Sequence, residues 1–142
     1  MPANNPNFDL LVSKKQRNNF IVSDFLDVEN KIPLEKYIEY TDVAQIAGRE
    51  DLLEYYKDIA ISSGRLLIFT LGSKGSMVFF KGASYYQPAI KIQKITDTTG
   101  CGDSYLAAFS IEYYKSGNIQ KSMERGALAA SLVLQHYGGV EE

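Results

Sequence analysis

The chain has 142 residues, of which 45% are hydrophobic and 23% charged, and its formal net charge at pH 7 is −2. This length and composition are those of one globular domain at most, and the slightly acidic balance lacks the basic excess of a nucleic-acid-binding protein. The apolar runs are short and broken by polar residues, so we expect no membrane span, and the single cysteine fits a reducing cytoplasm.

Strands and helices alternate in the first half of the chain. We expect residues 1–18 to form a polar tail with a short helix at 8–17, ahead of a compact region at 19–142. Apolar runs predict strands at 19–24, 42–47 and 65–71. Helices are predicted at 33–40 and 50–63, the second of them ended by Gly64. This alternation indicates an α/β fold with right-handed crossovers.

The second half adds a hairpin and two helices. After a turn at 72–75, strands at 76–80 and 84–87 are predicted to pair as an antiparallel insertion at one edge of the sheet. Residues 90–95 alternate apolar and polar and predict a further strand. The last two helices are predicted at 102–115, ended by Gly117, and at 119–137.

The most informative segment is DTTGCGDS, residues 97–104, which joins the predicted strand at 90–95 to a helix. Gly100 and Gly102 allow the N–H groups of residues 100–102 to point toward a common centre, where the helix N-terminus adds positive partial charge. Asp103 places a carboxylate at the same helix start. An anion cradle beside a potential base is the arrangement that phosphoryl transfer to a hydroxyl requires. A plain strand-to-helix turn with a capping aspartate remains the alternative for the glycines alone.

This segment closely resembles DTTGAGDSF, the C-terminal signature of the PfkB (ribokinase-like) carbohydrate kinases, with Cys101 in place of alanine and Tyr105 in place of phenylalanine. Residues 70–76, TLGSKGS, are similar to the T-x-G-x-x-G segment that lines the nucleotide in this family. The resemblance therefore assigns to the nucleotide Thr70, Gly72, Lys74 and Gly75. Residues 126–130, GALAA, resemble the small-residue helix beside the adenine, which adds Gly126 and Ala130. For residues 70–76 the alternative is an ordinary turn leading into a β-hairpin, and for residues 126–130 it is packing between helices.

The resemblance also implies metal ions. Residues 47–50 lie where the family has N-x-x-E, a motif tied to magnesium and phosphate; Glu50 matches the glutamate, whereas Ala47 replaces the asparagine. We therefore expect Mg²⁺ near Glu50, held through water, and a monovalent cation such as K⁺ near Asp97 and the Thr99 carbonyl. The alternative is that Glu50 has no ligand and is there because a carboxylate is favourable in the first turn of a helix.

The family implies a ribokinase-like three-layer α/β/α sandwich, of which residues 19–142 would be the C-terminal, nucleotide-binding half. It implies transfer of the γ-phosphoryl group of ATP to a hydroxyl of a sugar or sugar derivative. Asp103 would accept the hydroxyl proton, and the amides of Gly100, Cys101 and Gly102 would form the anion hole. The order of elements looks most like fructosamine-type members such as fructoselysine 6-kinases. Cys101 as a nucleophile has no base partner in the sequence.

Two other functions stay open: a nucleotide-binding remnant without catalysis, and an α/β interaction domain without a nucleotide site. The expected partners are a small sugar and ATP, and neither nucleic acid nor a membrane. Full-length members of the family are much longer, and this chain resembles only their C-terminal half. We therefore expect sheet edges that the N-terminal half would cover to be exposed. Such edges would lead to self-association or to association with a missing N-terminal half.

Overall fold

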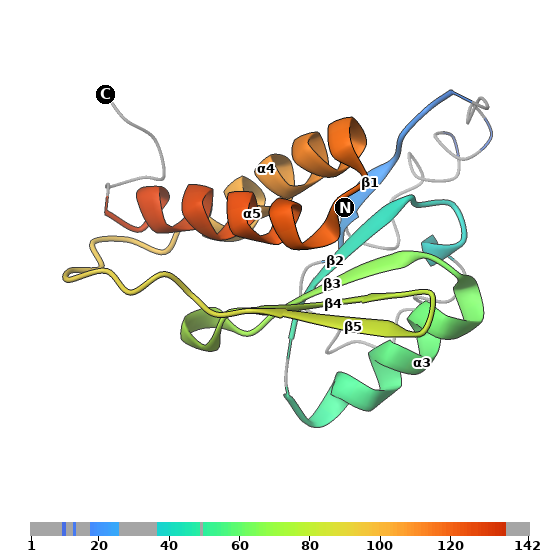
Figure 1. Cartoon of the computed structure of the whole chain (residues 1–142), viewed down its shortest axis with the longest axis horizontal. Helices are drawn as coiled ribbons and strands as arrows, with labels where there is room; N and C mark the ends of the chain where they lie inside the picture. Colours follow the sequence, from blue (N-terminus) through green and yellow to red (C-terminus); the bar gives the residue numbers. More distant parts are fainter. Residues whose placement is uncertain (1–9, 11–12, 14–17, 26–36, 49, 136–142) are drawn as a thin grey trace. The chain divides into compact units, whose positions relative to one another are not determined.

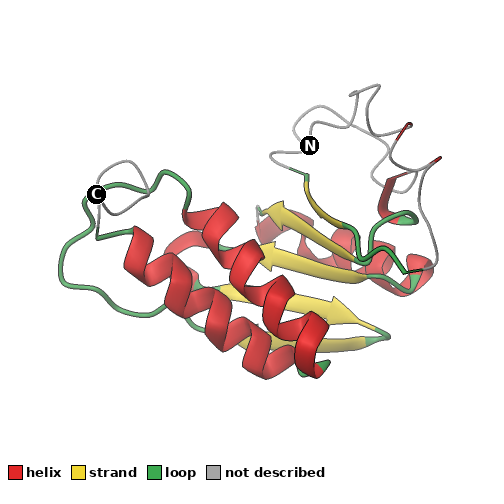
Figure 2. Cartoon of the chain, turned by 90° about the horizontal axis from the view of Figure 1, so that it is seen from above, coloured by secondary structure: helices red, strands yellow, loops and turns green. Residues whose placement is uncertain are grey.

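A computed structural model of the chain describes residues 18–25, 37–48 and 50–135, together with Leu10 and Ser13. Five strands form one sheet in the order β1-β2-β3-β4-β5 (Figure 1). They are β1 (Val22–Asp24), β2 (Val43–Ala47), β3 (Leu66–Thr70), β4 (Ser76–Phe80) and β5 (Ala83–Gln87). The helices are α3 (Leu53–Ser63), α4 (Cys101–Ser116) and α5 (Ile119–Val133), with short 3₁₀ turns η1 (Glu50–Leu52) and η2 (Gly72–Lys74) (Figure 2). The predicted α/β class is confirmed.

The chain divides into two compact units, of which the first holds Met1–Phe69 and Val78–Ser84. In this unit β1 runs parallel to β2, with Val22 opposite Val43. Residues 66–69 of β3 are fully buried, as predicted for a continuously apolar strand covered on both faces. Tyr56 of α3 packs on Phe69 with ring centroids 5.3 Å apart, which fixes this helix to the strand. Gly64 ends α3 in the left-handed conformation, as its position in the sequence predicts.

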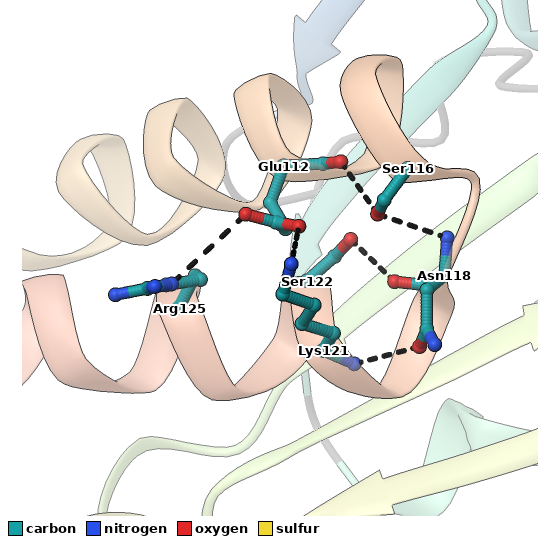
Figure 3. A network of polar contacts seen from close by, with 6 residues as sticks. All are labelled: Glu112, Ser116, Asn118, Lys121, Ser122 and Arg125. Atoms are coloured by element: carbon teal, nitrogen blue, oxygen red, sulfur yellow. Dashed lines mark hydrogen bonds and ion pairs between the residues drawn. The ribbon is translucent and has the colours of Figure 1, made fainter.

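The second unit holds Thr70–Met77 and Tyr85–Glu142. Its two helices, α4 and α5, are joined by the short turn at 117–118 and pack against each other as an antiparallel pair. The Asn118 side chain caps α5 by accepting a hydrogen bond from the Lys121 N–H at 2.9 Å. Beside this corner, the Glu112 carboxylate of α4 lies 2.7 Å from the Lys121 Nζ and 4.0 Å from the Arg125 Nε (Figure 3). The corner between the helices is thus held by a cap and an ion-pair cluster.

The predicted hairpin is confirmed, because β4 and β5 are neighbours joined by the two residues Lys81 and Gly82, both with positive φ. The strand predicted at 90–95 is wrong. Ile90 and Ile95 are 40% and 58% exposed, and the segment pairs with no other strand in the described part of the chain. An alternating pattern becomes a strand only where a neighbour completes the hydrogen-bond ladder and covers one face.

Other boundaries shift by a few residues. The helix predicted at 50–63 begins as the 3₁₀ turn η1 and becomes α-helical at Leu53. The last helix ends at Val133, short of the predicted end, and the Gln135 N–H bonds the Leu132 carbonyl in the tighter pattern of a final turn. The helices predicted at 8–17 and 33–40 lie mostly outside the described residues, and the boundary predicted at 18/19 stays a prediction. None of the helices described is both long and apolar enough to cross a membrane.

Candidate functional site

The turn before α4 is closed by the side chain of Asp97. Its Oδ1 accepts hydrogen bonds from the Thr99 N–H at 3.0 Å and from the Thr99 hydroxyl at 2.9 Å. Such an Asx turn reverses the chain just before a helix. Gly100 then caps α4 in the left-handed conformation, with φ 77°, and its carbonyl accepts the first helical bond, from the Ser104 N–H at 2.9 Å. The bend at 97–100 is therefore ordered by its own residues.

The helix start carries the predicted anion-binding groups. The Asp103 N–H lies in the first turn of α4, which a helix leaves without an intrahelical acceptor, so positive partial charge gathers there. The Asp103 side chain is exposed on this same turn. The Cys101 N–H already donates to the Thr98 carbonyl over a long distance of 3.2 Å. An incoming anion would have to compete with this carbonyl for the N–H. Gly100, Cys101 and Gly102 thus follow one another at the helix start, as expected, and their role stays a prediction.

The Cys101 thiol is unsuited to nucleophilic chemistry. The side chain is half-buried between the helices, and its Sγ lies 4.0 Å from the Ala130 carbonyl oxygen of α5. Burial raises the pKa of the Cys101 thiol, so the unreactive protonated form prevails at neutral pH. Cys101 fills space at the start of the α4–α5 contact.

The turn at 71–75 closes on itself. The Leu71 N–H donates to the Gly75 carbonyl at 2.8 Å, and the Gly75 N–H donates to the Gly72 carbonyl at 3.0 Å. From β5, the Tyr86 hydroxyl donates to the Lys74 carbonyl at 2.7 Å. Gly72, Ser73 and Lys74 are exposed at the tip of this turn. The predicted nucleotide segment is therefore a turn closed by hydrogen bonds, with an accessible tip.

The two glycines of this turn are needed for different reasons. At Gly75 the backbone has φ 101° and ψ −140°, and a Cβ would lie 2.1 Å from the Gln87 carbonyl oxygen, so no other residue fits. Gly72 also has a positive φ, 58°, but nothing lies within 4 Å of a Cβ built there. Gly75 is a packing requirement, whereas the space over Gly72 is open to a ligand.

Gly126 of α5 is buried against the ring of Tyr105 of α4. A Cβ on Gly126 would lie 2.9 Å from this ring, so helix packing already explains why the residue is glycine. The Tyr105 hydroxyl in turn forms a hydrogen bond of 2.7 Å with the Ser76 Oγ, directly after the 71–75 turn. The nucleotide roles predicted for Gly126 and Ala130 stay predictions. Neither Tyr105 nor Ser76 was predicted from the sequence to have a role, although the departure from phenylalanine at 105 was a visible signal.

Glu50 lies in the first unit, exposed in η1, whereas the segments at 70–75, 97–103 and 126–130 all belong to the second. Within the described ranges, no group of three or more His, Cys, Asp or Glu side chains is placed to hold a metal. One carboxylate suits Mg²⁺ only when phosphate oxygens and water supply most of the ligands. The metal-binding roles predicted for Glu50, Asp97 and Thr99 stay predictions.

Comparison with known proteins supplies the remaining context. The model of the pfkB family carbohydrate kinases matches residues 37–142. A nucleoside kinase of Methanocaldococcus jannaschii is 34% identical over 142 residues, which cover 94% of this chain and 47% of the relative. The crystal structure of the nucleoside kinase from M. jannaschii, an archaeal member of the ribokinase family, matches with a TM-score of 0.75 at 30% identity, covering 95% of this chain and 48% of that one. Arabidopsis thaliana ribokinase, complexed with ribose and ATP, matches in fold with a TM-score of 0.72 at 23% identity, over 84% of this chain and 42% of that one. The chain spans about half the length of the M. jannaschii protein.

Proposed function

The chain belongs to the pfkB family of carbohydrate kinases, and from this premise we propose that it forms the ATP-binding side of an enzyme that phosphorylates a hydroxyl of a sugar or sugar derivative. The ribokinase-like α/β fold expected from the sequence is confirmed by the structural relatives, of which this chain covers about half. The observation that carries the proposal is the start of α4. There a glycine cap, a helix N-terminus and an exposed carboxylate occur within four residues, 100–103.

In the proposed mechanism, Asp103 accepts the proton of the acceptor hydroxyl as its oxygen attacks the γ-phosphorus of ATP. The amides of Gly100, Cys101 and Gly102 donate to the charge that spreads over the transferred group. The leaving β-phosphate takes the bonding pair, so ADP and the phosphorylated acceptor result. The exposed position of Asp103 leaves the carboxylate open to an acceptor that other parts of a longer enzyme would hold.

The rest of the nucleotide would contact the 70–75 segment. The open space over Gly72, together with the exposed Ser73 and Lys74, lets a phosphate approach the backbone and the Lys74 ammonium. Thr70, Gly72, Lys74 and Gly75 are the proposed contacts, with Gly126 and Ala130 beside the base. Gly75 would contribute by holding the shape of the turn.

Metal ions complete the proposal. Mg²⁺, when bound with ATP, would neutralise charge on the phosphates, and Glu50 would bind its water ligands. A K⁺ ion near Asp97 and the Thr99 carbonyl would brace the bend at 97–100. Since Asp97 Oδ1 already accepts two hydrogen bonds from Thr99, the bend does not depend on this ion for its order.

The acceptor is proposed at the level of a class. A sugar hydroxyl follows from the family, and fructosamine derivatives stay a prediction. A nucleoside is a second candidate, favoured by the 34% identity to a nucleoside kinase over 94% of this chain. A nucleotide-binding remnant without catalysis is the alternative function, and the single cysteine keeps the cytoplasm as the proposed location.

The test combines binding and turnover. Calorimetry of the chain with ATP and Mg²⁺ should show one binding site. A panel of sugars and nucleosides, tested with an intact enzyme that contains this chain, should reveal the acceptor by release of ADP. In an intact enzyme that contains this chain, Asp103→Asn should lower turnover by about 10²- to 10⁴-fold with little change in ATP affinity, because it removes only the base. The matched control is Asp58→Asn, which changes an exposed aspartate of α3 in the first unit.

Three outcomes discriminate among the functions. Near-normal turnover of Asp103→Asn would refute the assigned base. ATP binding without turnover of any acceptor, also by an intact enzyme that contains this chain, would favour the non-catalytic remnant. Absence of ATP binding by the folded chain would refute the nucleotide site itself.

A further inference from the structure

The Tyr105 side chain of α4 contacts Ser76, which directly follows the 71–75 turn, and Gly126 of α5. We propose that Tyr105 is a positioning residue, which holds the 71–75 turn, the start of α4 and Gly126 of α5 in the one arrangement that binds ATP. This inference rests on the proposed function and goes beyond it, because it gives a role to a hydroxyl that contacts no substrate.

The link to the 71–75 turn is a buried hydrogen bond. The Tyr105 hydroxyl and the Ser76 Oγ lie 2.7 Å apart, and the two residues are 5% and 2% exposed. Two hydroxyls buried in this way must satisfy each other, since water cannot reach them. Burial also raises the pKa of Tyr105 to about 12, partly offset by the bond to Ser76, so the phenol keeps its proton at physiological pH.

Ser76 transmits this restraint to the turn. It follows Gly75, whose backbone already lies so close to the Gln87 carbonyl that no Cβ fits between them. The turn is thus fixed on one side by β5 and on the other by the Tyr105 hydroxyl. With both in place, the exposed tip at Gly72 has one position relative to α4.

The ring of Tyr105 is held equally firmly. It packs on Gly126 and stacks on Phe109, with ring centroids 6.3 Å apart and an interplanar angle of 16°. Asp103 lies two residues before Tyr105 in α4, which places it about 200° around the helix. The helix therefore directs Tyr105 into the core and Asp103 into solvent as parts of one rigid body.

The hydroxyl, rather than the ring, carries the positioning role. Phenylalanine would keep the packing on Gly126 and Phe109 and would lose only the bond to Ser76. Two phosphate-binding segments act together only when their separation is right, and this bond sets that separation.

The experiment is a double-mutant cycle on the 142-residue chain. ATP affinity is measured by calorimetry, and unfolding free energy by urea denaturation, for wild type, Tyr105→Phe, Ser76→Ala and the double variant. Each single variant leaves one buried hydroxyl without its hydrogen-bond partner and should lose stability. The double variant removes both hydroxyls and should recover most of that stability. ATP affinity should fall about tenfold in both single variants and should not recover in the double variant, because the turn is no longer tied to α4.

The matched control is Ser122→Ala. Ser122 is fully buried, and its hydroxyl donates to the Asn118 carbonyl at 2.6 Å, in the first turn of α5 and one helical turn before Gly126 (Figure 3). This variant should lose stability and keep its ATP affinity. All affinities are compared at a temperature where every variant is folded.

The results separate the inference from the function on which it rests. Unchanged ATP affinity in Tyr105→Phe, or affinity that recovers together with stability in the double variant, would overturn the positioning role alone. An equal loss of affinity in Ser122→Ala would also overturn it, since the effect would then be global. No ATP binding by the wild type would overturn the positioning role and the proposed function together.

Discussion

Replacement of the two glycines of the 71–75 turn by alanine should have very different effects on stability. Both residues have positive φ, 58° at Gly72 and 101° at Gly75, so both substitutions strain the backbone. Only at Gly75 would the new Cβ also meet another backbone atom, the Gln87 carbonyl oxygen at 2.1 Å. The pair therefore separates conformational strain from steric collision within one turn.

The magnitudes follow from these two terms. At Gly72 the left-handed conformation alone should cost Gly72→Ala about 1–2 kcal/mol of unfolding free energy. Gly75→Ala adds overpacking against a carbonyl held in β5, which can retreat only by distorting the sheet, and we expect a total of about 3–5 kcal/mol. For a domain with about 5–15 kcal/mol of stability, the second loss is a large fraction of the whole.

Urea denaturation followed by far-UV circular dichroism measures both losses, and the thermal midpoint of Gly75→Ala should fall roughly 10 °C below that of Gly72→Ala. Calorimetry with ATP adds the functional contrast. Gly72→Ala should weaken ATP binding, because its Cβ occupies the space proposed for a phosphate. Equal stability losses for the two variants would refute the collision between a Cβ at Gly75 and the Gln87 carbonyl.

Three further predictions concern ionisable groups. The bond to Lys121 lowers the pKa of Glu112, so the ionised carboxylate stabilises the fold above the usual pKa of 4.5, and this stabilisation is lost as the pH falls through the folded pKa. Glu112→Gln should therefore be less stable than wild type at pH 7, and the difference in unfolding free energy should disappear in acid. Burial raises the pKa of Tyr105 to about 12, so the unfolding free energy of the wild type should decline between the ordinary pKa of 10 and pH 12. In urea denaturation over this alkaline range, the unfolding free energy of Tyr105→Phe should decline less. The half-buried Cys101 thiol should react with iodoacetamide several-fold more slowly at pH 8 in the folded chain than in urea, and equal rates would contradict the raised pKa.

Local signals predicted most of the elements correctly. Gly64 and Gly117 mark the ends of α3 and α4 because a left-handed residue stops a helix whatever surrounds it. The apolar run of β3 predicted a strand buried on both faces, since few polar groups interrupt it. The motif at 97–104 was found by its resemblance to a family signature, and its glycines predicted the start of α4 because a glycine cap and the first helical turn lie within a few bonds of each other.

Features that depend on contacts between distant residues could not be predicted from the sequence. The segment 90–95 has a strand's alternation and forms none, since hydrogen-bond partners must come from elsewhere in the chain. The packing of Gly126 against the ring of Tyr105 could not be predicted either, because these two residues lie on different helices.

The sequence by itself determined the family, the α/β class and the position of the glycine-containing turn before α4, because these depend on short strings and on the backbone preferences of glycine. Only the tertiary structure decided that Gly75 admits no side chain and that Tyr105 joins Ser76 to Gly126. The physical reason is that close packing and buried hydrogen bonds are made between residues far apart in the chain, where no local pattern records which partners will meet.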